Sequence, residues 1–246
     1  IISVIMAIVG VTFAIPISIA IYCGEPEVLL SFIIPMILSF VFFLSVYIPF
    51  RKVKFRLSIR QTFAIVALCW ITASFMGAMP LYFSRTFPSF TDAFFESVSG
   101  FTTTGCSVCP SVEDLPRSIN MWRCLTHWLG GMGIVTLTVA LLPLLGIGGF
   151  RLIKAETTGP EKGKVTARIT TTAKILWLIY ASLTLIEAIL LRICGMDTID
   201  AFAHAFSTLG TGGFSSRNAS IGAWFSPAMD YVITVFMLLS GVNFSL

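Results

Sequence analysis

Residues 92–107 hold an apolar stretch that is too short to cross a membrane but is flanked by stretches long enough to do so. It begins at Asp92, runs apolar to Phe101 and continues into the strip Thr102-Thr103-Thr104-Gly105. As a helix, Asp92–Phe101 rises about 15 Å, roughly half of the ~30 Å hydrocarbon core of a bilayer. We therefore expect a half-helix that enters the membrane and ends at a Thr/Gly strip.

A second copy of this pattern lies 108 residues further along the chain. Shifted without a gap, Asp-Ala-Phe at 92–94 falls on the same tripeptide at 200–202. This register selects 211–213, rather than 208–210, as the second strip. Because the match extends back to Arg60 and Arg168, the duplicated unit includes an apolar segment as well as the loop. The other matched pairs are Ser99 with Ser207, Thr103 with Thr211, Gly105 with Gly213, and Ser107 with Ser215.

Composition excludes an ordinary soluble domain. Hydrophobic residues make up 56% of the chain and charged residues 11%, whereas soluble domains carry roughly 25% charged residues. The expected class is an integral membrane protein in contact with lipid. The net charge of +4 is segregated and forms no basic stripe, so no nucleic-acid partner is expected.

The apolar segments predict an all-α integral membrane fold. Two N-terminal transmembrane helices precede tandem helix–pore-helix–helix (M1-P-M2) repeats with re-entrant filter loops. Pro16 and Pro35 predict kinks in the first two helices. The chain starts without methionine and ends within an apolar run, so we expect a fragment. The expected parts are a two-helix membrane domain (1–59), pore repeat one (60–145), a cytoplasmic loop (146–172) and a truncated pore repeat two (173–246).

The distribution of basic residues predicts the orientation. The connections at 51–60 and 151–174 hold 11 of the 16 lysines and arginines. The positive-inside rule places these connections in the cytoplasm, so both Thr/Gly loops enter from the outer face. Acidic residues on the outer side would attract cations, or they are ordinary loop residues; the sequence leaves both interpretations open. They include Glu25, Glu27, Asp92, Glu96, Glu113, Asp114, Asp197, Asp200 and Asp230.

The two strips offer only uncharged oxygen ligands. Gly105 and Gly213 permit backbone angles that turn carbonyls inward, and Thr103 and Thr211 add hydroxyl oxygens. Such a set suits a monovalent cation that must also leave, whereas a carboxylate cage would hold a divalent ion too tightly. One strip alone is more typical of a turn, but two in register favour a pore. The candidate filter residues are Thr102, Thr103, Thr104, Gly105, Thr211, Gly212, Gly213 and Phe214.

Other polar residues give weaker signals. His127 and His204 could titrate or bind a metal, but a hydrogen-bonded packing role is favoured for both. Glu187 is the one acid well inside a span and is a functional candidate, with Arg192 as its possible partner. Cys106 to Cys109 forms a CxxC pattern without a second ligand pair, which argues against a redox or zinc site.

Three motifs resemble the Trk/Ktr/HKT superfamily of potassium transporters, most closely its bacterial TrkH branch. They are SGFTTTGCS at 99–107, HWLGGMGI at 127–134 and FSTLGTGGFS at 206–215. The resemblance covers nearly the whole chain. It implies four span–half-helix–span repeats around one pore, preceded by two extra helices. Repeats three and four are absent from this sequence, so the resemblance implies that the chain does not transport alone unless two copies assemble.

The resemblance also implies a substrate and partners. Gly105 and Gly213 match the filter glycines of the first two repeats. In the family, glycine at the position of Gly105 is associated with potassium transport, and serine at that position is associated with sodium transport. It places K⁺ at Thr103, Thr104, Gly105, Thr211, Gly212 and Gly213, with no organic cofactor. It further implies a homodimer in the bacterial inner membrane and a cytosolic nucleotide-binding regulatory subunit.

Three alternatives remain at this point. A sodium-conducting relative would share the whole architecture. A membrane-embedded metalloenzyme would use Cys106, Cys109 and His127 as ligands. A structural membrane subunit would carry the two strips as polar turns. The favoured prediction is a potassium transport protein that is not an enzyme.

Overall fold

The computed structural model describes residues 2–50, 59–141 and 162–241, and every regular element within them is a helix. Among these residues, four helical segments are long and apolar enough to cross a bilayer by length and composition. They are Ile2–Cys23, Pro26–Phe50, Phe63–Phe83 and Lys174–Ile193. The all-α prediction is confirmed. Most of the two basic connections lies outside the described residues, and so does much of the predicted loop at 146–172.

The first apolar segment is broken one turn before its proline. It forms α1 (Ile2–Thr12) and α2 (Ala14–Cys23), with the break at Phe13. Pro16 has no N–H to donate to the carbonyl four residues earlier, and its ring crowds that carbonyl, so the helix fails at that point. The predicted kink therefore lies upstream of the proline itself. The next helix, α3 (Pro26–Phe50), continues unbroken through Pro35.

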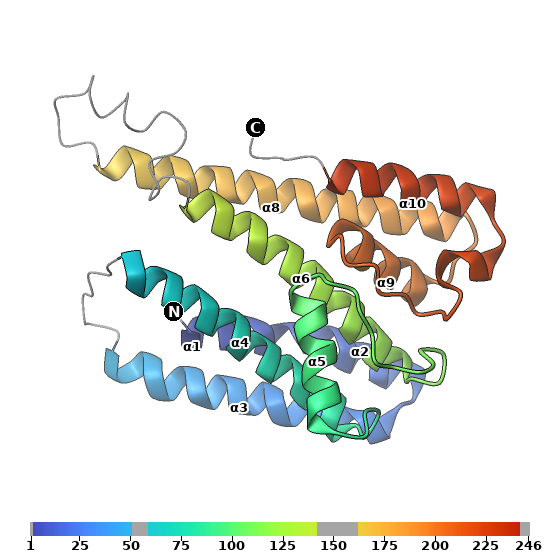
Figure 1. Cartoon of the computed structure of the whole chain (residues 1–246), viewed down its shortest axis with the longest axis horizontal. Helices are drawn as coiled ribbons and strands as arrows, with labels where there is room; N and C mark the ends of the chain where they lie inside the picture. Colours follow the sequence, from blue (N-terminus) through green and yellow to red (C-terminus); the bar gives the residue numbers. More distant parts are fainter. Residues whose placement is uncertain (1, 51–58, 142–161, 242–246) are drawn as a thin grey trace.

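The middle of the chain forms α4 (Ile59–Phe83), α5 (Phe90–Phe101) and α6 (Arg117–Leu141). In Figure 1, α6 crosses diagonally between the group α1–α4 and the group α8–α10. Its Trp122 is fully buried, and its ring centroid lies 4.6 Å from that of Phe13. The Trp122 indole N–H donates to the Gly77 carbonyl at 3.0 Å, which fixes α6 to α4.

The last part forms α8 (Lys162–Ile193), α9 (Thr198–Leu209), the 3₁₀ turn η1 (Ser220–Trp224) and α10 (Pro227–Ser240). The helix α8 begins within the loop predicted at 146–172. Its 32 residues rise about 48 Å, which exceeds the ~30 Å hydrocarbon core. A helix of this length projects beyond the apolar window at 174–193.

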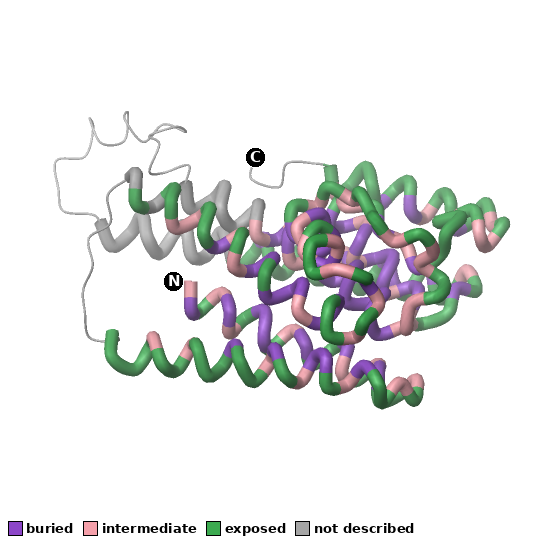
Figure 2. Tube along the Cα trace, turned by 60° about the horizontal axis from the view of Figure 1, so that its bottom comes forward, coloured by how far each residue is buried: buried purple, intermediate pink, exposed green. Residues whose placement is uncertain are grey.

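Buried residues concentrate where the short helices α5 and α9 meet α6, as Figure 2 shows. Away from this centre, large apolar side chains face outward; Leu30 is 64% exposed, Leu178 69% and Leu238 70%. Apolar surface of this extent is typical of a chain surrounded by lipid rather than by water.

The N-terminus of α6 is capped by a residue from far upstream. Glu25, in the turn between α2 and α3, accepts from the Arg117 N–H at 2.8 Å and from the Ser118 N–H at 3.2 Å. The Ser118 hydroxyl also donates to this carboxylate, at 2.5 Å. Glu25 therefore satisfies amides that a helix start leaves without partners, and its charge suits that end of the helix dipole.

We predict that Glu25→Ala destabilises the folded protein by about 1–2 kcal/mol, because it removes this cap. The measurement is thermal unfolding of the purified full-length protein in detergent. Glu27→Ala is the control, because Glu27 is exposed on the first turn of α3. Equal unfolding temperatures for the two variants would contradict the capping role.

Candidate ion-binding site

The two half-helices repeat at the offset of 108 found in the sequence. Both α5 and α9 have 12 residues, and their first residues, Phe90 and Thr198, match at that offset. Each begins with a side-chain cap: Ser89 accepts from the Asp92 N–H, and Asp197 accepts from the Ile199 N–H. The sequence predicted the end of α5 correctly, at Phe101. It predicted the start at Asp92, two residues after the observed start at Phe90.

Each half-helix ends in the same turn, with a threonine in the left-handed region. Thr103 has φ 54° and Thr211 has φ 55°. Helices usually end this way at glycine, and a β-branched residue there costs about 1–3 kcal/mol. A strained threonine at both equivalent positions points to a use for its side chain. The turns are closed by Thr103 N–H to Gly100 O, Thr104 N–H to Ser99 O, Thr211 N–H to Thr208 O and Gly212 N–H to Ser207 O.

The glycines that follow bring the two strips into contact. Gly105 has φ 75° and Gly213 has φ 88°, which a side chain would strain. A Cβ on Gly105 would collide with the carbonyl oxygen of Gly212, so the strips touch at this point. The structure thus brings together residues that are more than 100 positions apart in the sequence.

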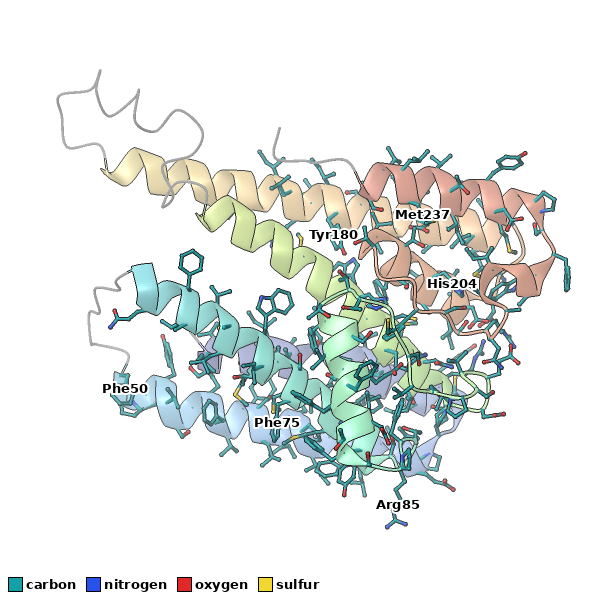
Figure 3. All side chains as sticks on the ribbon, in the orientation of Figure 1. Phe50, Phe75, Arg85, Tyr180, His204 and Met237 are labelled. Atoms are coloured by element: carbon teal, nitrogen blue, oxygen red, sulfur yellow. The ribbon has the colours of Figure 1, made fainter. Side chains whose placement is uncertain are left out.

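The second strip borders a cavity of about 320 Å³. His204 of α9 and Met237 of α10, both labelled in Figure 3, contribute to its lining. Thr211, Gly212 and Gly213 also line it, and the cavity is large enough for an ion with water. In the first strip, Thr102 and Thr104 are exposed, and their hydroxyl oxygens lie 2.7 Å apart.

Phe214 differs from the other candidate residues because its side chain is buried. Its ring stacks on the His127 ring, with centroids 4.1 Å apart. Its carbonyl oxygen lies 3.9 Å from the Cys124 thiol, which can donate to it. Through these contacts Phe214 packs against α6 and supports the second strip.

A patch of small residues on α6, within residues 127–133, contacts both half-helices. A Cβ on Gly130 would collide with the Phe101 carbonyl, and one on Gly131 would lie 2.9 Å from the Cα of Gly210. Small residues in this patch thus permit close backbone approach. It allows one helix to support the C-terminal ends of both α5 and α9.

His127 packs against the second strip. Its Nδ1 lies 3.1 Å from the Ser207 hydroxyl and accepts from the Phe214 N–H at 3.4 Å. A Cβ on Gly212 would collide with the imidazole ring, which explains why glycine stands there. The predicted packing role is confirmed. Among the described residues, no three His, Cys, Asp or Glu side chains are close enough to hold a metal ion.

A buried ion pair lies behind the strips. Arg123 on α6 donates from Nε to Glu96 on α5 at 2.7 Å, and the two residues are 2% and 1% exposed. The guanidinium carbon of Arg123 also lies 4.4 Å from the centroid of the Phe214 ring. The interpretation of Glu96 as an outer-mouth charge is therefore wrong, because its charge is paired inside the protein. The sequence signal that could have indicated this pair is an arginine and a glutamate that each lie within an apolar stretch.

Asp200 is also buried and paired. Its carboxylate lies 3.4 Å from Arg217 and 3.8 Å from Arg117. Arg117 also pairs with Asp197 at 2.5 Å. Burial alone would raise the pKa of Asp197, but the Arg117 guanidinium outweighs it and holds that pKa below its ordinary value. These residues fix the start of α9 and leave less free acidic charge at this face than the sequence indicated.

Two weaker candidates do not join the strips. Glu187 is fully buried on α8, close to the Thr208 side chain at the end of α9, and the suggested contact with Arg192 is absent from the described part of the chain. Cys106 and Cys109 are free, and the Cys109 thiol donates to the Ser111 carbonyl at 3.2 Å. Burial raises the pKa of Cys109, which is the opposite of what a reactive thiolate requires.

Comparison with known proteins identifies the family. The sequence model of the TrkH family, described as a cation transport protein, matches residues 29–246. The chain belongs to this family. Its apolar helices and this membership make it an integral membrane protein. The relatives described next are transport proteins, in agreement with the prediction that the chain is not an enzyme.

The relatives are about twice as long as this chain. The Trk system potassium uptake protein TrkH of Escherichia coli (strain K12) is 47% identical over 201 residues, which are 80% of this chain and 41% of that protein. TrkI of Halomonas elongata is 34% identical over 247 residues, covering 100% of this chain and 50% of that protein. The crystal structure of the potassium transporter TrkH from Vibrio parahaemolyticus superposes with a TM-score of 0.85 at 36% identity, covering 99% of this chain and 49% of that one.

We predict that Gly130→Ala destabilises the protein by about 1–3 kcal/mol, because its methyl group collides with the backbone of α5. Gly133→Ala, in the same patch, is the matched control. Its Cβ would meet only the Trp70 side chain, at 3.2 Å. The thermal unfolding temperature in detergent checks the difference, and an equal loss in the two variants would contradict the close approach of α6 to α5.

Proposed function

We propose that this chain forms part of the membrane subunit of a potassium uptake system and that its two strips bind the transported K⁺. The observation that carries the proposal is the repeated backbone path, with a left-handed threonine followed two residues later by a positive-φ glycine. Contact between Gly105 and Gly212 brings the two paths to one place. Family membership and the names of the relatives support the same substrate.

The ligands in this proposal are the carbonyl and hydroxyl oxygens of Thr103, Thr104, Gly105 and residues 211–213. Both half-helices end at the strips, so the negative ends of their dipoles favour a cation there. Neutral oxygens replace the hydration shell of a monovalent ion without holding it too strongly to release. Phe214 then acts through its packing on His127 rather than as a ligand.

The proposed architecture consists of two pore repeats after an N-terminal helix pair. In this proposal α4, α5 and α6 form the repeat at 60–145, and α8, α9 and α10 form the repeat at 173–246. The loops enter from the outer face of a bacterial inner membrane, and the basic connections are cytoplasmic. The partners are lipid, a second copy of the full-length protein and a cytosolic nucleotide-binding regulatory subunit.

We predict that Gly105→Ser and Gly213→Ser impair growth at limiting potassium when the full-length protein is the only uptake system of a potassium-uptake-deficient bacterium. The side chain strains the positive φ, and at Gly105 it also collides with Gly212. The K⁺ concentration for half-maximal growth should rise about tenfold or more.

The matched control is Gly24→Ser. Gly24 has φ 70°, similar to Gly105, and open space around its Cβ position, but it lies between α2 and α3. It therefore introduces the same backbone strain away from the strips. Native growth of both strip variants at limiting K⁺ would sink the assignment. Uptake of Na⁺ in preference to K⁺ by the native protein would favour the sodium-conducting alternative.

No metal-binding group is found around Cys106, Cys109 and His127 within the described part of the chain, and Cys109→Ser tests the metalloenzyme alternative directly. We expect K⁺-limited growth to stay within about twofold of native, because a serine hydroxyl can keep the hydrogen bond to the Ser111 carbonyl. Complete loss of growth with normal amounts of protein in the membrane would instead indicate a metal ligand or redox thiol.

A further inference from the structure

A serine two residues beyond Gly105 ties the first strip back to its own half-helix. The Ser107 hydroxyl donates to the Glu96 carboxylate, with distances of 2.9 and 3.1 Å to its two oxygens. The Ser107 oxygen also accepts from the Cys109 N–H at 3.1 Å. The Val108 N–H donates to the same carboxylate at 3.1 Å, so the segment leaving the strip is held against α5 through both residues.

The second strip has an equivalent serine. The Ser215 oxygen lies 3.0 Å from His204 Nε2 and accepts from the Arg217 N–H at 3.0 Å. His204 Nδ1 lies 2.9 Å from the Asp200 carbonyl oxygen, which can only accept. In the neutral ring Nδ1 therefore carries the hydrogen, and Nε2 accepts from the Ser215 hydroxyl.

All three members of these contacts correspond at the offset of 108. Glu96 matches His204, Ser107 matches Ser215, and the Cys109 N–H matches the Arg217 N–H. The acceptor has changed from a carboxylate to an imidazole, while the hydroxyl and its two hydrogen bonds are retained. We call these two arrangements the serine braces.

We propose that the serine braces set the positions of the pore oxygens and thereby the discrimination between K⁺ and Na⁺; this inference rests on the proposed function. Each strip is held at its first residues by the turn that closes the half-helix. Two residues beyond its last glycine, it is held by the brace. Only a few residues lie between these two attachments. Their carbonyls are therefore ordered before an ion arrives, and such ordering favours one ionic radius over another.

The two braces differ in their surroundings. The first includes the buried cation Arg123, which donates from Nη2 to Ser107 at 3.2 Å and lies over the Phe214 ring of the other strip. In the second, the rings of His204 and Trp224 are perpendicular, with centroids 5.0 Å apart. A hydrogen bond to a charged acceptor is stronger than one to a neutral acceptor, so losing Ser107 should have the larger effect.

Ser107→Ala and Ser215→Ala test the proposal in the full-length protein, in the potassium-uptake-deficient bacterium. Glu96 is a poor target because its removal leaves Arg123 buried without its ion partner, which endangers folding. The readouts are KM and Vmax for K⁺ uptake, inhibition of uptake by Na⁺, and the amount of protein in the membrane. We expect the preference for K⁺ over Na⁺ to fall about fivefold for Ser107→Ala and about threefold for Ser215→Ala.

Two further sets of variants separate a positioning role from general packing. Ser107→Thr and Ser215→Thr retain the hydroxyl and should restore most of the preference for K⁺. Ser216→Ala is the matched control, because the Ser216 hydroxyl is buried without a hydrogen-bond partner in the described structure; it should behave as native.

The inference is overturned if the two alanine variants keep the native K⁺ preference, if threonine restores nothing, or if Ser216→Ala loses as much. A native protein that takes up no K⁺ would instead overturn the proposed function. If Gly105→Ser changes the preference for K⁺ over Na⁺ but Ser107→Ala and Ser215→Ala do not, only the role of the serine braces is wrong.

Discussion

Close contact between α6 and the C-terminal ends of α5 and α9 is the constraint on which the arrangement of the strips depends. Gly130 and Gly131 place the α6 backbone against Phe101 and Gly210, and no side chain fits between them. His127, one turn earlier, and Arg123, two turns earlier, fill the space behind the strips with a stacked ring and a buried ion pair. A single helix thus supports two strips that are distant in sequence, and glycines at the contact make this possible.

The sequence was most informative where local chemistry decides the structure. Thr and Gly after a half-length apolar stretch, repeated at a fixed offset, predicted α5 and α9 and the relation between their ends. Pro16 predicted a kink in the first helix, and the structure has a break about one turn earlier, where the missing hydrogen bond would have been.

Contacts across the fold could not be predicted in the same way. A count of charges treats Glu96 as one more outer acid, since its partner on α6 is known only once α5 and α6 are packed together. The left-handed threonines were equally hidden, because propensity alone places glycine at such a turn. The early start of α8 was missed because a polar, cationic stretch can extend a helix beyond the bilayer as readily as form a loop.

The carboxylate that caps α6 also bears on the order in which the protein is made. Glu25 is synthesised before α6, whose first amides it accepts. The turn between α2 and α3 has therefore already been synthesised when α6 emerges, so the acceptor for the first amides of α6 is present before α6 packs. The N-terminal helix pair thus supplies the cap of the helix on which the rest of the site is built.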